Sequence, residues 1–487
     1  MLTLALVLMV VIPAVGGVLA GAFKGASSRG AAVTAAAATA ALAAWATATV
    51  YGGAHAAAVG DMPWLGGPAA TPVVGVLLDP LGSILLLVVT VIGLLTVVYS
   101  TRYLGSDNRD HRVPPTEHPR YYFWLLLFLA SMVGVAISPN FLQLFFFWEL
   151  TTVCSWALIS YYRNEKSLAA GFKALVVTQV GGVFFLVAVL ILFARTGSFE
   201  FGALALLPDR LRLVVFVLLL LAAWAKAAQV PFHTWLPEAM EAPTPISAYL
   251  HAAAMVKAGV FLMARSVSSG WAMPVEVGMV MGAMAVLTLF IALTYYFVQD
   301  DLKRLLAYST IAHLGYVLLG ISLGALGSTV GFRGGVLHII CHGFAKATLF
   351  LCVGAIAYVT GSRSISALGG LAKTMPLTAA AFFVGVLAAT GVPPFSCFWS
   401  KFMILSGAVQ LGGAIGPALL VLVLLESLIA FSWMVYVGQK VFFGERTPVA
   451  CVNSDPPPAM SGVLVALMIG CLLAPAVGIP LVQWIGR

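Results

Sequence analysis

The sequence has few charged residues. Asp, Glu, Lys and Arg make up 9% of its 487 residues, whereas 61% are hydrophobic and the mean hydropathy is +1.04. A soluble domain carries about 25% charged residues, so the shortage excludes an ordinary soluble domain. No region reaches that charge density, and we therefore expect a single membrane domain over residues 1–487.

The sequence also lacks paired cysteines and the motifs of common cofactor sites. None of its cysteines forms a CxxC pair, and most lie inside apolar runs, where a free thiol acts as a small hydrophobic group; the cysteines are Cys154, Cys341, Cys352, Cys397, Cys451 and Cys471. Nothing resembles a nucleophile, a phosphate loop or a metal box. We expect no cofactor, no metal site and no redox site of its own.

Long apolar runs recur from end to end, and runs of about 20 residues can span the hydrocarbon core of a bilayer. The first run has no basic region before it, so we expect a retained helix rather than a signal peptide. We predict an all-α membrane protein of about fourteen spans: 1–22, 31–51, 72–101, 121–138, 141–160, 169–194, 212–229, 242–265, 273–297, 303–324, 333–359, 375–410, 416–438 and 460–484.

The basic residues are distributed unevenly between the two sets of loops. Of the 25 Lys and Arg residues, 15 fall in odd-numbered loops or the span ends beside them, 6 in even-numbered loops, the span ends beside them or the end of the chain, and 4 deep inside spans. Cytoplasmic loops carry the basic excess. We therefore expect the odd loops to be cytoplasmic and both termini to face the other side. The net charge of +8 indicates orientation, not nucleic-acid binding.

Several ionisable residues fall inside the predicted spans. A charge at the bilayer centre costs at least about 2.5–3.5 kcal/mol, so each such residue is a candidate functional residue. The candidates are Glu149, Lys226, His251, Lys257, His338, His342, Lys346 and Lys401. Glu426 fits a structural ion pair as well as a functional role. Lys173 and Arg265 lie near span ends, where basic side chains ordinarily reach toward the interface.

Three candidates share one helical stripe. His338, His342 and Lys346 follow i, i+4, i+8 spacing, which places them on one face over two turns. Burial in a poorly hydrated site disfavours a charged lysine, whereas a carboxylate favours it, so Glu149 and Lys226 can form a switchable pair. Histidines relay protons between such stations. The chemistry that these residue types favour is ion transport, most simply of protons.

Two distant segments resemble each other. Lys226 precedes Val-Pro-Phe in the seventh span, and Lys401 follows Val-Pro-Pro-Phe in the twelfth. Their separation by five spans predicts two inverted repeats, over 121–265 and 273–440, flanked by helices in 1–102 and 460–487. Inverted repeats with broken helices are typical of transporters. The prolines Pro231 and Pro393-Pro394 predict breaks in helices 7 and 12.

The segments AKAAQVPFHTWLPEAMEAPTPISAYLHAAAMVKAGVFLMAR, QDDLKRLLAYSTIAHLGY and HIICHGFAKATLF resemble a known family. It comprises the antiporter-like subunits of respiratory complex I, Mrp-type cation/proton antiporters and energy-converting membrane-bound hydrogenases. The resemblance covers roughly residues 65–445. It implies fourteen helices with inverted five-helix repeats, in agreement with the spans above.

The resemblance also implies residue roles. Glu149 and Lys226 match the family's helix-5 glutamate and helix-7 lysine, and Lys257, beside His251, matches a connecting lysine of helix 8. The relay residues and the exit lysine match His338, His342, Lys346 and Lys401. In this family the redox energy comes from partner subunits.

The chain therefore favours a proton-translocating subunit of a redox-driven complex of the hydrogenase or complex I type. The alternative within the family is a subunit of an Mrp-type Na+/H+ antiporter, and the alternative outside it is a passive scaffold for a soluble enzyme module. The expected partners are other membrane subunits, including further antiporter-like subunits, a soluble redox module, protons and, in the antiporter case, Na+. We expect the chain to lie in the cytoplasmic membrane of a bacterium or archaeon.

Overall fold

The fold was analysed in a computed structural model. It describes residues 1–51, 56–61, 72–448 and 454–485. Cys451 and the last residue, Arg487, which was counted among the 25 basic residues, lie outside these ranges.

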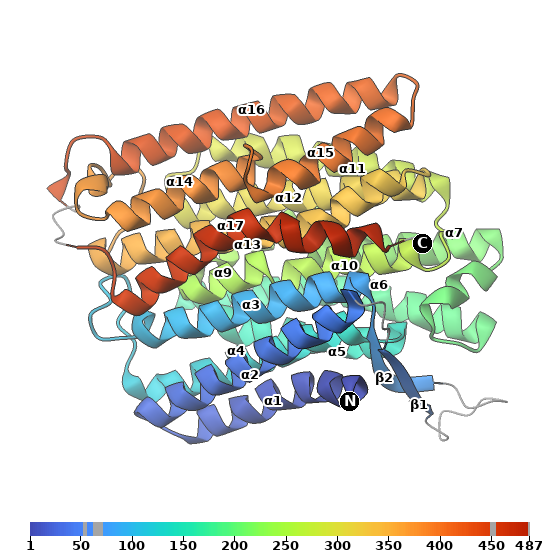
Figure 1. Cartoon of the computed structure of the whole chain (residues 1–487), viewed down its shortest axis with the longest axis horizontal. Helices are drawn as coiled ribbons and strands as arrows, with labels where there is room; N and C mark the ends of the chain where they lie inside the picture. The colour runs from blue at the N-terminus through green and yellow to red at the C-terminus, as the bar shows by residue number, and fades with distance from the viewer. Residues whose placement is uncertain (52–55, 62–71, 449–453, 486–487) are drawn as a thin grey trace.

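Helices that run nearly parallel to one another make up most of the described chain (Figure 1). They are α1 (Leu2–Ala22), α2 (Gly25–Tyr51), α3 (Pro80–Tyr103), α4 (His118–Ile137), α5 (Phe141–Ile159), α6 (Glu165–Thr196), α7 (Asp209–Lys226), α8 (Trp235–Glu238), α9 (Thr244–Ala252), α10 (Met255–Ser268), α11 (Val275–Tyr296), α12 (Leu302–Ala325), α13 (Thr329–Thr360), α14 (Pro376–Thr390), α15 (Ser396–Gln410), α16 (Ile415–Phe442) and α17 (Pro458–Gln483). Short 3-10 turns lie between them, and both termini lie at the same end of the bundle.

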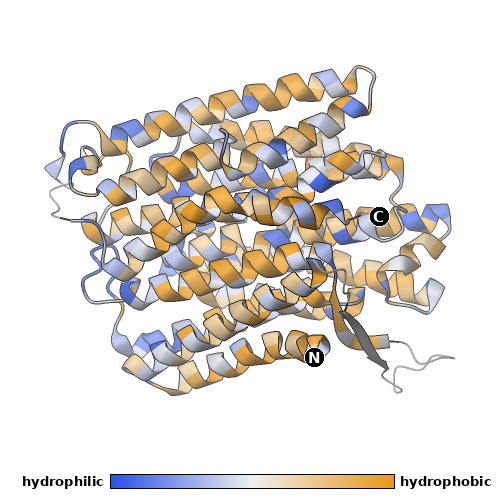
Figure 2. Ribbon diagram, viewed as in Figure 1, coloured by the Kyte–Doolittle hydropathy of each residue, from blue (hydrophilic) through white to orange (hydrophobic). Residues whose placement is uncertain are grey.

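The predicted membrane architecture is confirmed. Within the described ranges, twelve helical segments are long and apolar enough to cross a bilayer, with α9 and α10 together forming one of them. Apolar residues dominate along the helices, and hydrophilic residues gather at the ends and at a few interior positions (Figure 2). Helix α7 and the pair α14–α15 occupy the seventh and twelfth predicted spans. The count of fourteen and the inverted repeats stay predictions.

One expected helical segment is a strand. Residues 72–78 continue the apolar run of the third span, yet they form β2 (Pro72–Leu78), which pairs antiparallel with β1 (Ala56–Asp61). Helix α3 begins only at Pro80, because the side chain of Asp79 accepts a hydrogen bond from the backbone N–H of Gly82 and caps the helix. The prediction that the third span starts at residue 72 was therefore wrong.

In three of the predicted spans the helix is interrupted by a few non-helical residues. Helix α14 ends at Thr390 and α15 begins at Ser396, so the break predicted at Pro393-Pro394 is present. Helix α7 ends at Lys226, and the chain continues through the short turns around α8. A third break, between Ala252 and Met255, separates α9 from α10 and was not predicted. Each break leaves backbone groups without helical partners, as a polar path needs.

Helix α13 lies at the centre of the bundle. It packs against α3, α9, α12, α14, α15 and α17, and most of its length is buried. One of its close approaches is to α12, where a Cβ built on Gly320 would lie 2.5 Å from the Cα of Gly335. Small residues of this kind let helix backbones come together in a membrane. The contact brings the polar residues of α12 and α13 within hydrogen-bonding reach.

Arg265 corrects another prediction. It was expected to reach toward the interface, but its side chain is buried and forms two hydrogen bonds with the carboxylate of Asp79, one of them between Nη2 and Oδ1 at 2.9 Å. The ion pair therefore joins α10 to the N-terminus of α3. Lys173 is half-exposed, and its Nζ lies 2.5 Å from Oε1 of Glu238.

Candidate functional site

Lys226 is the last residue of α7 and is fully buried. Its Nζ donates hydrogen bonds to the carbonyl oxygen of Trp148 at 2.5 Å and to Oγ1 of Thr152 at 3.0 Å, both on α5. It also lies 4.2 Å from the centroid of the Trp148 ring, a contact that stabilises a cation. The break after α7 thus delivers one amine to the middle of α5.

Glu149 follows Trp148 on α5 and is half-buried, and its Oε1 has no hydrogen-bond partner in the described chain. Glu149 and Lys226 interact electrostatically, but no ion pair within 4.0 Å joins them in the described ranges. The predicted pair is therefore adjacent and not closed in this structure.

Gly182 on α6 leaves the space that the Glu149 carboxylate occupies. A Cβ at Gly182 would lie 2.2 Å from Oε1 of Glu149. We expect Gly182→Ala to displace the carboxylate and, through overpacking, to destabilise the protein by about 1–3 kcal/mol. Proton transport should fall together with the midpoint of thermal unfolding in detergent.

The matched control for this variant is Gly462→Ala on α17, because no atom lies within 4 Å of a Cβ there. Alanine is the better helix former, so the control should melt at the same temperature as the wild type or slightly above it. A Gly182→Ala protein that behaves like this control would show that the carboxylate does not need its present position.

The break between α9 and α10 lies between two candidate residues. His251 precedes it, is fully buried, and has no hydrogen-bond partner for either ring nitrogen within the described residues. Lys257 follows it, and its Nζ lies 2.6 Å from Nδ1 of His342 on α13. On an ideal helix the two side chains would point in different directions; here the break reorients them. Buried polar atoms without partners mark a place where water is needed.

A cluster of histidines continues from Lys257. The rings of His342 and His313 have centroids 4.9 Å apart, and Nδ1 of His313 lies 3.0 Å from Nε2 of His338. Nδ1 of His338 in turn lies 2.8 Å from Oγ of Ser400 on α15. All three histidines are buried. The i, i+4, i+8 stripe of α13 thus faces α10 and α12, and α12 supplies His313 between two of its members.

The path ends at a second buried lysine. Nζ of Lys401 on α15 donates to Oγ of Ser427 at 2.9 Å and to the carbonyl oxygen of Thr390 at 3.2 Å, and it lies 4.4 Å from the centroid of the Tyr316 ring. The Tyr316 hydroxyl donates to Oε2 of Glu426, which is also buried. Glu426 thus lies beside Lys401 and is joined to it through neutral groups.

Lys346 is the remaining member of the α13 stripe. It is fully buried, and its Nζ donates a hydrogen bond to Oγ of Ser309 on α12. The eight predicted residues therefore lie in two groups. Glu149 and Lys226 form one group, and the other extends across the bundle centre from Lys257 to Lys401. No hydrogen bond connects the two groups in the described part of the chain.

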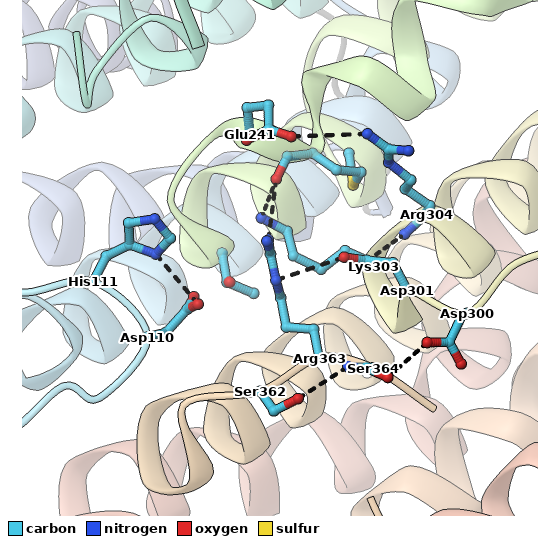
Figure 3. Close-up of polar contacts among 12 residues, drawn as sticks. Asp110, His111, Glu241, Asp300, Asp301, Lys303, Arg304, Ser362, Arg363 and Ser364 are labelled. Carbon is cyan, nitrogen blue, oxygen red and sulfur yellow. Dashed lines mark hydrogen bonds and ion pairs between the residues drawn. The ribbon is translucent and has the colours of Figure 1, made fainter. Parts of the chain in front are cut away.

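A polar network at one end of the bundle holds α9 in place (Figure 3). Nζ of Lys303 donates to the carbonyl oxygens of Met240 and Ala242, both at 2.7 Å, and Nε of Arg363 lies 3.7 Å from Oδ2 of Asp301. Lys303 lies at the first residue of the predicted span 303–324, and it is fully buried at the start of α12. It binds the segment that leads into α9 and so positions His251.

Asp110 lies in the α3–α4 connection at the same end. Nδ1 of His111 lies 3.2 Å from its Oδ1, and Arg363 is near (Figure 3). Burial raises the pKa of the Asp110 carboxyl, but the contact with His111 and the positive charge of Arg363 together hold that pKa below its usual range. Asp110 therefore remains ionised at neutral pH.

One group of side chains has the composition of a metal site. Ligand atoms of His313, His338 and Cys397 lie within 4.8 Å of one another. Nδ1 of His313 and Nε2 of His338 already lie within hydrogen-bonding distance of each other, an arrangement that fits proton exchange between imidazoles.

His313 and Tyr316 are the residues that sequence reasoning missed. Both lie on α12, where Ser309, His313 and Tyr316 recur at helical spacing, but only His313 among these three titrates near neutral pH. Counting every ionisable residue inside a span would have found His313. Its place between His342 and His338 depends on the packing of α12 against α13, which no local pattern shows.

Comparison with known protein families shows which family the chain belongs to. The family described as "NADH:quinone oxidoreductase/Mrp antiporter, TM" matches residues 138–430, more than half of the chain. The chain belongs to this family. Residues 64–112 also match the N-terminal family of complex I chain 5. The first match covers Glu149, Lys226 and every other candidate up to Glu426.

Curated relatives give the same placement. The chain is 38% identical over 376 residues to NAD(P)H-quinone oxidoreductase chain 5 of Synechocystis sp., which covers 73% of this chain and 53% of the relative. It is also 38% identical over 366 residues to the chloroplast subunit 5 of Chaetosphaeridium globosum, covering 71% and 52%. The chain thus spans about half the length of the curated relatives it matches.

Solved structures share the fold. A chain in the Mrp complex of Dietzia sp. superposes with a TM-score of 0.84 at 29% identity, covering all of this chain and 52% of that one. A chain in the membrane-bound sulfane sulfur reductase, an archaeal respiratory membrane complex, superposes with a TM-score of 0.83 at 26% identity, covering 98% and 96%. The family membership predicted from the sequence is confirmed.

Proposed function

We propose that this chain is a proton-translocating, antiporter-like subunit of a multi-subunit membrane complex driven by a redox reaction. The observation that carries the proposal is the buried series from Lys257 through His342 and His313 to His338. It continues to Lys401 through Tyr316, whose ring lies next to His338 and under the Lys401 amine. Ionisable groups at membrane depth are costly, and in this chain they lie next to one another along one line. A scaffold gives no reason for that arrangement.

In the proposed route, protons enter near the α9–α10 break through His251 and Lys257 and equilibrate with Lys226. They cross the bundle through the histidines beside Lys346 and leave from Lys401. Glu149 sets the proton affinity of Lys226 by approaching it or withdrawing. Glu426 gives Lys401 a nearby negative charge in the same way. Each step uses groups that gain and lose a proton, and the redox energy comes from a partner module.

We infer the membrane orientation from the basic loops. The connections α1–α2 and α3–α4 lie at one end of the bundle, and both termini lie at the other (Figure 1). By the basic-residue excess, the first end is cytoplasmic and the termini face outward. The membrane is the cytoplasmic membrane of a bacterium or archaeon, and the bundle completes fourteen spans in two inverted repeats. The partners are further membrane subunits, antiporter-like ones included.

A second candidate is a subunit of an Mrp-type Na+/H+ antiporter. It is favoured by the superposition on a chain of the Mrp complex, which covers the whole of this chain. The two candidates share the relay and differ in what drives it. The driving reaction therefore separates them.

The test is proton transport in membrane vesicles, driven first by oxidation of hydrogen or NADH and then by an imposed sodium gradient. With a redox donor we expect acidification in the wild type and a loss of about two orders of magnitude in Lys401→Ala, since a proton-transferring group typically contributes 10²–10⁴-fold. The variant must assemble into the complex to the wild-type level.

Transport driven by sodium alone would establish the Mrp-type candidate. If Lys401→Ala transports protons as well as the wild type with the redox donor and with the sodium gradient, the proposed relay is wrong. The chain would then be a passive scaffold.

A further inference from the structure

A cavity of about 320 Å³ opens at the end of the bundle that carries the α3–α4 connection. Its walls come from the start of α2, the end of α3, the connection that follows α3, the end of α13 and the residue before α17. It lies apart from the relay, and none of the relay residues lines it. Its volume is in the range of pockets that hold small ligands.

Two arginines give the cavity its charge. Arg29 from α2 and Arg102 from α3 both line it, and neither forms an ion pair within 4.0 Å in the described ranges. One carboxylate, that of Asp107, also lines the cavity, and it accepts a hydrogen bond from Ser106 at 3.4 Å. The cavity is therefore cationic on balance. Its guanidinium groups have the planar donor geometry that binds phosphate bidentately.

An apolar surface begins beside the same cavity. Gly25 lines it, and two residues earlier Phe23 is 47% exposed at the end of α1. Exposed Leu19 and Val18 continue that surface along the helix into the hydrophobic part of the bundle. A dissolved anion would gain no favourable contact with these apolar side chains, whereas the acyl chains of a lipid would cover them. The cavity with its two arginines could therefore hold a lipid head group, and the apolar surface of α1 could hold the acyl chains.

We propose that this cavity binds the phosphodiester head group of an anionic phospholipid through Arg29 and Arg102, with the acyl chains against α1. Basic pockets between membrane helices on the cytoplasmic side recognise such head groups. The chemistry shared with a dissolved source is the phosphate anion. The apolar surface at Phe23 assigns the lipid as its source. The proposal does not depend on what the relay transports.

The test uses the full chain in its complex, purified and delipidated in detergent. Phosphatidylglycerol in mixed micelles is titrated into the wild type and into an Arg29→Gln, Arg102→Gln double variant, and bound lipid is counted by native mass spectrometry. Each basic residue near a membrane surface contributes about 1 kcal/mol to anionic lipid binding, so the double variant should bind roughly 30-fold more weakly. An Arg29→Lys, Arg102→Lys variant should retain most of the affinity.

The matched control is Arg112→Gln with Arg163→Gln, which removes two exposed charges outside the cavity. This control should bind phosphatidylglycerol as the wild type does, and thermal melting of both double variants shows that they are folded. If the cavity variant melts early, Arg102→Gln alone replaces it. If the cavity variant and the control lose the same amount of bound phosphatidylglycerol, the effect is one of general surface charge, and the proposed site is wrong.

Two further titrations separate the sources of phosphate. Phosphatidylcholine should bind far more weakly than phosphatidylglycerol, and excess inorganic phosphate should leave bound phosphatidylglycerol in place. Equal binding of the zwitterionic lipid would overturn the requirement for an anionic head group. Binding of inorganic phosphate alone, with displacement of the lipid, would make the cavity a site for a dissolved anion.

Discussion

Replacing Lys226 with methionine is expected to reduce proton transport by about two orders of magnitude, the lower end of what a proton-transferring group contributes. Methionine keeps most of the volume of the side chain and removes its titratable amine. The amine is the only group of α7 that reaches the Trp148 carbonyl and Thr152. Transport is measured as acidification of vesicles that contain the assembled complex.

A Lys226→Arg variant separates proton exchange from charge. Arginine remains protonated at all working pH values, so it preserves the cation beside the Trp148 ring and cannot release a proton. We expect it to be as inactive as Lys226→Met. Lys166→Met, which removes an exposed lysine at the start of α6, is the matched control and should transport normally. Full activity of the arginine variant would mean that Lys226 acts as a fixed charge.

His313→Phe is expected to have a loss of similar size, although no sequence pattern marked this residue. It interrupts the contact at 3.0 Å between His313 and His338 and removes the ring next to His342. Because these groups lie in series, His313→Phe combined with His338→Phe should transport no worse than either single variant. Strictly series elements are not additive when any one of them is lost.

The matched control for His313→Phe is His111→Phe in the α3–α4 connection, where the ring stacks on Tyr162 outside the bundle core. Its transport should be that of the wild type, and its melting temperature should fall slightly because the contact with Asp110 is lost. Additive losses in the double variant would contradict a single path and would require a second route that avoids one of the two histidines.

The sequence predicted the spans well because length and apolarity decide membrane crossing. The prediction failed where apolarity alone does not determine the secondary structure. Residues 72–78 read as the start of a helix, since a short apolar run does not distinguish strand from helix. The break between Ala252 and Met255 carries neither proline nor glycine, so no local signal marked it.

The sequence named eight ionisable residues of the candidate site, but it named neither His313 and Tyr316 nor the contacts between them. Buried charges such as Lys257 and Lys401 are conspicuous in any apolar run, which is why eight of them could be named. The partner of Arg265 is Asp79, far away in the sequence, and the link between His342 and His338 passes through another helix. Such links are properties of packing and appear only when the helices are assembled.

The contact between Gly320 and Gly335 limits how this protein can work. With the backbones of α12 and α13 already touching, these two helices have no room to slide inward, and any outward shift would part His313 from His338. The centre of the bundle therefore behaves as a fixed frame. Under the proposed function, the moving parts in this region are therefore side chains and protons, while α12 and α13 keep their positions.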